Sequence, residues 1–539
     1  GHESGGDPAC IPDLTYEQFL NFHRTYYHPS NSFIYLYGDM DMAEKLAWLD
    51  EAYLSGYDRK DPAAQADSRI RMQEPFKEPR HAETAYSITE EEDGENACYL
   101  SISDVAGTDL DPELYVAFQI LEYTLIDAPG APLKQALLDA GIGHDVLGGY
   151  DSGILQPYFS VIAKDARADQ KGEFLAAVKG TLQKLADQGI SRKSLLAGIN
   201  YYEFRYREAD YGSTPKGLMY GLQCLDSWLY DGDPLMHLEY EETFARLRQK
   251  VEDGYFEELI RQYLLDNPFE AVIVVKPEKN LTAKEDGETA AKLAAYKAGL
   301  SGEDIRRLVR ETRELKEYQD TPSPKEELEK IPMLRREDIG TKAEEIRWTE
   351  RVIDGVPALH HCLFTSGIGY LRVLFDMNRV PAEDLPYAAF LKSVLGYVDT
   401  ENYRYADLTS EIHLNTGGIS FCTTSYPDLA HAPAFTGVFA ADVRVMYDKI
   451  GIGCALLTEI LTRSRLDDTR RLGEVLREAR SRSRMRLEGS SHSAPVTRAS
   501  RPSMAHTCTR PPPREEAVTS SFRPFPPPTR SSTVLGCTP

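Results

Sequence analysis

Histidines that lie close to one another are the first candidates for metal chemistry in this sequence. His23 and His28 are five residues apart, whereas two zinc ligands on one helix are usually four apart, so that both imidazoles share a face. A spacing of five turns the two side chains about 140° apart around a helix, and no Asp or Glu lies between them. We therefore expect His23 and His28 to serve packing and capping.

The run His360-His361-Cys362 has suitable side chains for a metal site but unsuitable geometry. Successive residues of a strand point to opposite faces, so at most His360 and Cys362 share a face, and the sequence offers no third donor nearby. His237 and Glu241 are four residues apart, which on a helix is typical of a solvated pair. We expect no metal site at either place.

Motifs for phosphate binding and for a serine nucleophile are absent from the sequence. The glycines at 141, 143, 148 and 149 form neither G-x-G-x-x-G after a strand nor G-x-x-x-x-G-K-[ST]. G-x-S-x-G is absent as well. The charged run from Arg205 to Asp210 precedes a Gly-Ser-Thr-Pro turn. We interpret it as a structural ion-pair network, with substrate contact as the lesser alternative. No complete active site is predicted.

Length, composition and charge limit the class of protein. A chain of 539 residues is too long for one core, and 42% hydrophobic with 27% charged residues is typical of a soluble globular protein. A net charge of −24 argues against nucleic acid and against an anionic membrane as partner. The sequence lacks the run of about eighteen apolar residues that a transmembrane helix needs. The eight cysteines form no C-x-x-C pair, so we expect a reducing, cytoplasmic compartment.

The elements that would position these residues form an α+β domain up to about residue 276. A capping box at Thr15 and Gln18 predicts a helix over 16–27, and the aromatic run 32–38 predicts a strand. Residues 57–82 contain several prolines and are predicted to be a linker. Further strands are expected at 84–89, 97–103, 158–163 and 271–276, and further helices at 41–55, 111–125, 132–140, 174–187, 192–207 and 236–265.

The chain changes character after residue 276. Residues 277–344 are predicted to form two solvent-exposed helices that join two larger units. A second α+β domain is expected over 345–499, with a hairpin at Asp354-Gly355, strands at 369–376 and 418–424, and a helix at 385–398. Residues 500–539 contain nine prolines and are expected to be disordered. A shifted reading frame is the favoured interpretation of this tail, with an interaction tail as the alternative.

Three stretches of sequence carry a family resemblance. They are IPDLTYEQFLNFHRTYYHPSNSFIYLYGDMD from residue 11, NYYEFRYREADYGSTPKGLMYGLQCLDSWLYDGDP from residue 200, and LEKIPMLRREDI from residue 328. The sequence resembles the pitrilysin and insulinase superfamily of zinc metallopeptidases, and within it the presequence protease subgroup, over residues 5–499. The resemblance implies an α+β fold of repeated pitrilysin-type domains with mainly antiparallel sheets. The whole protein would be a monomeric clam shell that closes around peptides and unfolded segments.

The resemblance also implies where the zinc should be. The family holds zinc with two histidines of an H-x-x-E-H helix and a distal glutamate, and the motif glutamate acts as general base. This sequence contains no H-x-x-E-H. Ala388, Leu391 and Lys392 fall where the repeat of that motif would lie in the second domain, and none of them can replace its counterpart. We therefore expect no catalytic and no metal-binding residue in this chain.

These expectations lead to a functional hypothesis. With no basic start and no apolar stretch at its beginning, the sequence is not expected to contain a signal peptide. Residue 1 is also not Met. We expect an interior portion of a longer protein, containing the end of its first domain and its second domain (1–276), a helical hinge (277–344) and a degenerate third domain (345–499). This portion would supply chamber wall and hinge to a zinc metalloendopeptidase. The alternative is a non-catalytic partner or scaffold subunit of the same superfamily.

Overall fold

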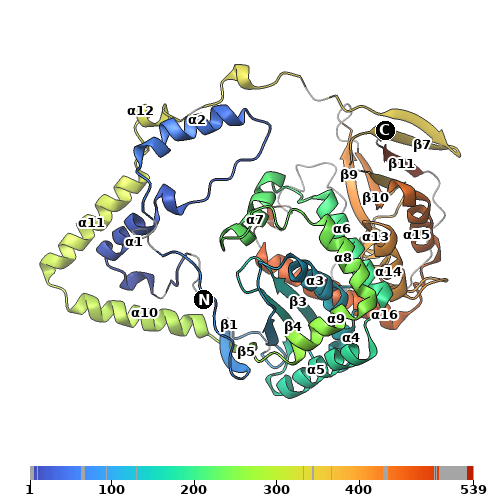
Figure 1. Ribbon diagram of the computed structural model, residues 1–539, viewed down its shortest axis with the longest axis horizontal. Helices are drawn as coiled ribbons and strands as arrows, with labels where there is room; N and C mark the ends of the chain where they lie inside the picture. Colours follow the sequence, from blue (N-terminus) through green and yellow to red (C-terminus); the bar gives the residue numbers. More distant parts are fainter. Residues whose placement is uncertain are drawn as a thin grey trace.

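Two sheets, each flanked by helices, form the body of the molecule (Figure 1). The computed structural model describes residues 5–8, 10–61, 67–92, 94–128, 130–331, 333–342, 345–365, 367–428, 435–490, 492, 495–496 and 531–537. We call residues 80–279 the N-terminal unit, and the described residues of 349–489 together with 531–537 the C-terminal unit. The fold is α+β and most neighbouring strands are antiparallel, which confirms the predicted class.

The sheet of the N-terminal unit has the strand order β1-β5-β2-β4-β3, with β1 and β5 parallel and the other neighbours antiparallel. Alternating burial follows the alternating sequence: Leu100 and Ile102 of β2, and Val272 and Val274 of β5, are buried. The strands are β1 (Arg80–Ile88), β2 (Cys98–Val105), β3 (Asp145–Asp151), β4 (Tyr158–Ala166) and β5 (Glu270–Lys279). β5 thus continues past the boundary expected at residue 276.

Helices pack on this sheet around a single aromatic-rich core. Phe118, Phe159, Phe174, Phe244 and Phe256 are all fully buried in it, and burying one such side chain contributes about 1.5–3 kcal/mol. The helices are α3 (Pro112–Glu122), α4 (Pro132–Asp139), α5 (Lys171–Gln188), α6 (Arg192–Glu208), α7 (Lys216–Trp228), α8 (Glu241–Lys250) and α9 (Tyr255–Leu259). π-helical turns at Tyr123–Asp127 and Ile260–Leu265 extend α3 and α9.

The C-terminal unit is built on a sheet of order β6-β7-β11-β8-β10-β9. Its first hairpin turns at Asp354 and Gly355, which both have positive φ (49° and 85°), so the predicted two-residue turn is confirmed. The strands are β6 (Thr349–Ile353), β7 (Val356–Cys362), β8 (Ile368–Asp376), β9 (Gly418–Pro427) and β10 (Phe435–Met446). The helices are α13 (Leu385–Val394), α14 (Tyr405–Asn415), α15 (Ile450–Arg463) and α16 (Thr469–Gly489).

Part of the predicted disordered tail is a strand. β11 (Ser531–Cys537) lies between β7 and β8, parallel to the first and antiparallel to the second. The expectation of disorder is therefore wrong for these residues. They follow the last proline cluster, and their sequence, SSTVLGC, has the Thr and Val content of a strand. Residues 500–530 and 538–539, covered by the same expectation, lie outside the described residues.

Helices α10 (Leu281–Ala298), α11 (Gly302–Asp320) and the short α12 (Lys325–Leu328) form an arm between the two units. The two long helices are present where exposed helices are predicted, and neither has a buried residue. α11 begins at a capping box of Ser301 and Asp304. The arm lies with α1 (Tyr16–Tyr26) and α2 (Met42–Ala52) to one side of the sheets (Figure 1).

The predicted strand over 32–38 does not form. The capping box of α1 at Thr15 and Gln18 is present as predicted, but residues 32–37 pair with neither described sheet. They run against α7, where the Tyr35 ring covers Gly221 and the Tyr37 ring covers Gly217. Aromatic residues favour extended backbone, but a strand also needs a hydrogen-bonding neighbour, and here the neighbour is a helix. Within the described residues, no helix has the length and apolar character needed to cross a bilayer.

Candidate functional site at the junction of the two units

α6 is the element on which the two units meet. Its Leu195 and Ile199 are buried in the core of the N-terminal unit, and its other face packs against α14 (Figure 1). The helix begins at Arg192, and the hydroxyl of the preceding Ser191 caps it by accepting the Ser194 amide. Near its end, Phe204 lies so close to Gly417 that a Cβ at that position would overlap the ring. A glycine is therefore required at 417 for this approach.

Polar side chains cross the junction in one network. The Glu208 side chain is 5% exposed and accepts from Tyr370 Oη at 2.8 Å and from the Arg444 guanidinium at 2.7 Å. Arg444 also donates to the Gly417 carbonyl at 3.0 Å. Asn200 Nδ2 donates to the Leu414 carbonyl at 3.2 Å. Buried polar groups need such partners, so these contacts fix how α6 meets the C-terminal unit.

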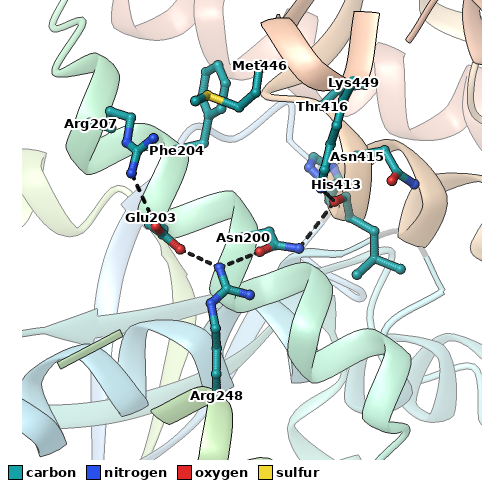
Figure 2. A pocket seen from close by; sticks show the side chains of 11 residues that line it. Asn200, Glu203, Phe204, Arg207, Arg248, His413, Asn415, Thr416, Met446 and Lys449 are labelled. Atoms are coloured by element: carbon teal, nitrogen blue, oxygen red, sulfur yellow. Dashed lines mark hydrogen bonds and ion pairs between the residues drawn. The ribbon is translucent and has the colours of Figure 1, made fainter. Parts of the chain in front are cut away.

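A pocket of about 180 Å³ opens beside this network, between α6 and the segments around Leu414 and Lys449 (Figure 2). Arg248 of α8 donates to Asn200 Oδ1 at 2.5 Å and also pairs with Glu203. Arg207 reaches the other oxygen of Glu203 at 3.6 Å. Lys449 Nζ donates to the Leu414 carbonyl at 2.9 Å. Among the described residues lining the pocket, three cations face one carboxylate.

His413 also lines the pocket but adds no charge to it. Its ring packs edge-on against Tyr123 and Tyr201, and its Nδ1 is buried without a hydrogen-bond partner. Burial, together with the positive charge of Arg444, lowers the pKa of His413 to about 4. The imidazole is therefore neutral near pH 7.

A second cluster of titratable groups lies inside the N-terminal unit. His237 and Asp109 are fully buried, with Nε2 and Oδ1 3.9 Å apart, and the His237 ring stacks on Tyr115. Burial raises the pKa of Asp109 to about 8, aided by the negative charges of Asp226 and Asp151. Burial lowers the pKa of His237 to about 4. A protonated carboxyl and a neutral imidazole therefore coexist near pH 7, closed off from solvent.

The expectation that His237 and Glu241 form a solvated helical pair is wrong. α8 begins at Glu241, and His237 lies in the turns before it. The imidazole is buried because those turns fold back over α3, where Tyr115 supplies an aromatic face and its hydroxyl donates to Asp226 at 3.0 Å. A spacing of four residues pairs side chains only within a helix, and residues 237–240 are not helical.

The other histidine candidates have structural contacts. His28 Nδ1 accepts the Ser30 amide at 3.1 Å, which is a capping contact, and the His23 ring stacks on Tyr27. His361 Nδ1 lies 3.1 Å from the Arg347 carbonyl. Within the part of the chain that the structure describes, no group of three or more His, Cys, Asp or Glu side chains is arranged to hold a metal ion. These donors do not fit a catalytic zinc.

The positions expected to match a degenerate zinc motif belong to α13. Ala388 is buried and Leu391 packs against the core of the C-terminal unit, beside Leu408 and Phe439. Lys392 is the basic residue of the last turn. An alanine and a leucine at these places serve packing and offer no electron pair to a metal.

Sequence reasoning missed the residues that form the pocket. Its candidate run from Arg205 to Asp210 does contribute Arg207 to the pocket and Glu208 to the junction. Asn200 could have been flagged, because Asn is unfavourable in the interior of a helix unless its amide has a partner. Arg248 and Lys449 carried no signal, since each meets its partner, Asn200 or Leu414, only through the fold of its own unit.

Comparison with known proteins assigns the family. Residues 13–201 match the family described as peptidase M16 inactive domain, and residues 275–507 match the associated domain of peptidase M16, subgroup C. "Protein HypA" of Clostridium perfringens is 40% identical over 486 residues, covering 90% of this chain and 49% of that protein. "Presequence protease 1, chloroplastic/mitochondrial" of Arabidopsis thaliana is 32% identical over 505 residues, covering 92% and 46%. The chain spans about half the length of the curated relatives it matches.

Solved structures of similar proteins include the crystal structure of pitrilysin, with a TM-score of 0.43, 13% identity, and coverage of 90% of this chain and 48% of that one. The chain belongs to the M16 family of pitrilysin-type peptidases. Within the family it belongs to the subgroup that contains the presequence proteases, as the resemblance of its sequence implies.

Proposed function

We propose that this chain is a non-catalytic portion of an M16 zinc metalloendopeptidase that degrades peptides and unfolded segments in a closed chamber. Its likeness to a presequence protease over 505 residues carries the proposal, and the description of the family matched by residues 13–201 as inactive supports it. The two units would form chamber wall, and the arm of α10 and α11 would form the hinge. The whole protein would be a monomeric clam shell.

The zinc of the whole enzyme is assigned to residues outside this chain. The sequence has no H-x-x-E-H, and the described residues do not bring three suitable donors together. A zinc that activates water needs three protein ligands and an open position. This chain's contribution would be to shape and close the space around a peptide.

The arm has the construction expected of a hinge. Neither α10 nor α11 buries a residue, so either can move as a rigid rod without exposing core. The helices are joined at Gly299–Ser301, and α11 ends just before Thr321-Pro322. Motion would therefore concentrate in these short connections, as is usual for hinges.

The alternative, a scaffold or partner subunit, agrees with one observation. Large aromatic side chains on α1 and α2 are exposed, including Tyr16 at 76%, Phe19 at 64% and Trp48 at 63%. Exposed apolar surface of this kind marks an interaction site. A separate polypeptide carrying H-x-x-E-H could cover it, just as a further domain of the same protein could.

The test is to measure zinc content and peptide cleavage on the purified chain. We expect far less than one zinc per chain and no chelator-sensitive cleavage of an unfolded peptide. The variant His360→Ala/His361→Ala is the control, because it removes any weak surface binding by that pair. One tightly held zinc that survives in the double variant, together with cleavage abolished by a chelator, would refute the proposal. Stable capture of a separate H-x-x-E-H polypeptide would favour the scaffold alternative.

A further inference from the structure

We propose that the pocket at the junction binds a small anion of the carboxylate or phosphate type, held between the two units. The chain as a whole carries a net charge of −24, yet this pocket is lined by Arg207, Arg248 and Lys449 against Glu203 alone. Such a local reversal of sign in an acidic protein concentrates anions at one place.

The cations of the pocket keep donors that the protein does not use. The ion pair of Arg207 with Glu203 spans 3.6 Å, which is longer than a hydrogen bond, so most of its five N–H groups remain available. Lys449 donates to one carbonyl and has three protons to give. Arg207 and Lys449 lie at opposite sides of the pocket (Figure 2), so a ligand oxygen beside either side chain would receive charge-assisted hydrogen bonds from it.

The pocket has room and a partly apolar wall. Its 180 Å³ is well above the roughly 10–15 Å³ that one water needs, so an anion with a short side group fits. Phe204, Leu414 and Met446 line it together with the cations (Figure 2). Apolar walls lower the local dielectric constant and strengthen ion pairing. The chemistry suits a carboxylate beside an apolar group, such as the last residue of a peptide, or a free phosphate.

The placement of the cations gives the anion a mechanical consequence. Arg207 and Arg248 belong to the N-terminal unit, whereas Lys449 belongs to the C-terminal unit. An anion that contacts residues of both units would add an interaction that exists only when α6 meets the C-terminal unit. Binding would therefore favour the joined arrangement, because a ligand stabilises the state that holds it more tightly.

The experiment is calorimetric titration of the full chain with three probes: inorganic phosphate, N-acetyl-leucine and N-acetyl-leucinamide. We expect saturable binding of at least one of the two anions, none of the uncharged amide, and weakening as salt is raised. Tighter binding of N-acetyl-leucine would identify the peptide-type carboxylate as the ligand, and tighter binding of phosphate the free ion. Absence of saturable binding up to about 10 mM, well above a millimolar dissociation constant, would overturn the proposal.

Variants locate the binding site. Arg207→Met should weaken binding about tenfold, as expected for loss of one charge-assisted hydrogen bond. Glu203→Gln should tighten it, since the competing carboxylate is removed, and a gain of affinity cannot come from misfolding. Arg313→Met, on the exposed face of α11, is the charge-matched control and should leave affinity unchanged. Equal affinities in all four proteins would show that the anion binds elsewhere and would reject this pocket.

Discussion

Replacing Glu208 by alanine should loosen the junction between the two units. The Glu208 carboxylate is 5% exposed and accepts from both Tyr370 and Arg444. Removing one partner of a fully buried ion pair costs about 3–5 kcal/mol. Arg444 is 41% exposed and stays partly solvated, so losing its ion pair with Glu208 should cost only about 1 kcal/mol. Losing the Tyr370 hydrogen bond adds about 1 kcal/mol, so we expect about 2 kcal/mol in total.

The measurement must report on the junction and not on global unfolding, because a chain of several units does not unfold in one step. Native-state hydrogen exchange of α14 amides meets this need, since it yields local opening free energies. A loss of about 2 kcal/mol corresponds to roughly thirtyfold faster exchange. Glu208→Gln keeps an acceptor for Tyr370 and should give about half the loss in free energy.

The matched control is an exposed ion pair elsewhere in the N-terminal unit. Glu83 pairs with Lys276, and their side chains are 57% and 43% exposed. Glu83→Ala should cost little stability, as is usual for surface pairs, and should leave α14 exchange unchanged. If Glu208→Ala accelerates α14 exchange no more than Glu83→Ala does, then the carboxylate does not hold the junction, and the reasoning fails.

Two further predictions concern packing and pH. Gly417→Ala should destabilise the junction by about 1–3 kcal/mol, since its Cβ would overlap the Phe204 ring; adding Phe204→Leu should recover part of this loss in hydrogen exchange, and no recovery would exclude the clash as the cause. In the buried pair, the pKa of Asp109 is raised to about 8 in the folded chain, compared with about 4 in the unfolded chain. The contribution of Asp109 to stability is therefore fully present below about pH 4 and is lost as the pH rises to about 8. The pKa of His237 is lowered to about 4, so its contribution to stability has the opposite pH dependence. This contribution is present above about pH 6.5 and is lost as the pH falls to about 4. Asp109→Asn should therefore be increasingly more stable than the parent chain between pH 5 and pH 8 in guanidinium titrations; parallel pH profiles would contradict this.

Sequence patterns predicted helices and strands well where the pattern and the element that it specifies lie in the same short segment. The alternation around Leu100 and Ile102 predicted β2, and the capping box of Thr15 and Gln18 placed the start of α1. β3 was missed because Gly148-Gly149 resembles a loop. In the structure Gly148 lets Ile126 pack directly on the strand, since a Cβ there would lie 2.6 Å from its Cδ1. Glycine in the interior of a strand often marks such a close approach.

The candidate site could not be predicted because its pairs are distant in sequence. Glu208 and Arg444 are 236 residues apart, and Asn200 and Leu414 are 214 apart. No periodicity within one segment relates such residues. His237 shows the converse error, because a spacing of four toward Glu241 suggested a pair that the turns before α8 prevent. The resemblance to a known family, which rests on long runs of matching sequence, predicted the class of protein, whereas residue spacing alone could not.

The polar character of the junction bears on how the two units can move. An interface built on a large apolar surface would be permanent, whereas interfaces between mobile domains are more polar. Here Glu208, Arg444 and Asn200 meet directional partners, and the close contact of Phe204 with Gly417 is lost after a small displacement. These contacts share α6, so they should break together and not one by one. We therefore expect the junction to open in one step, and an anion in the pocket that contacts both units would shift this equilibrium toward the joined state.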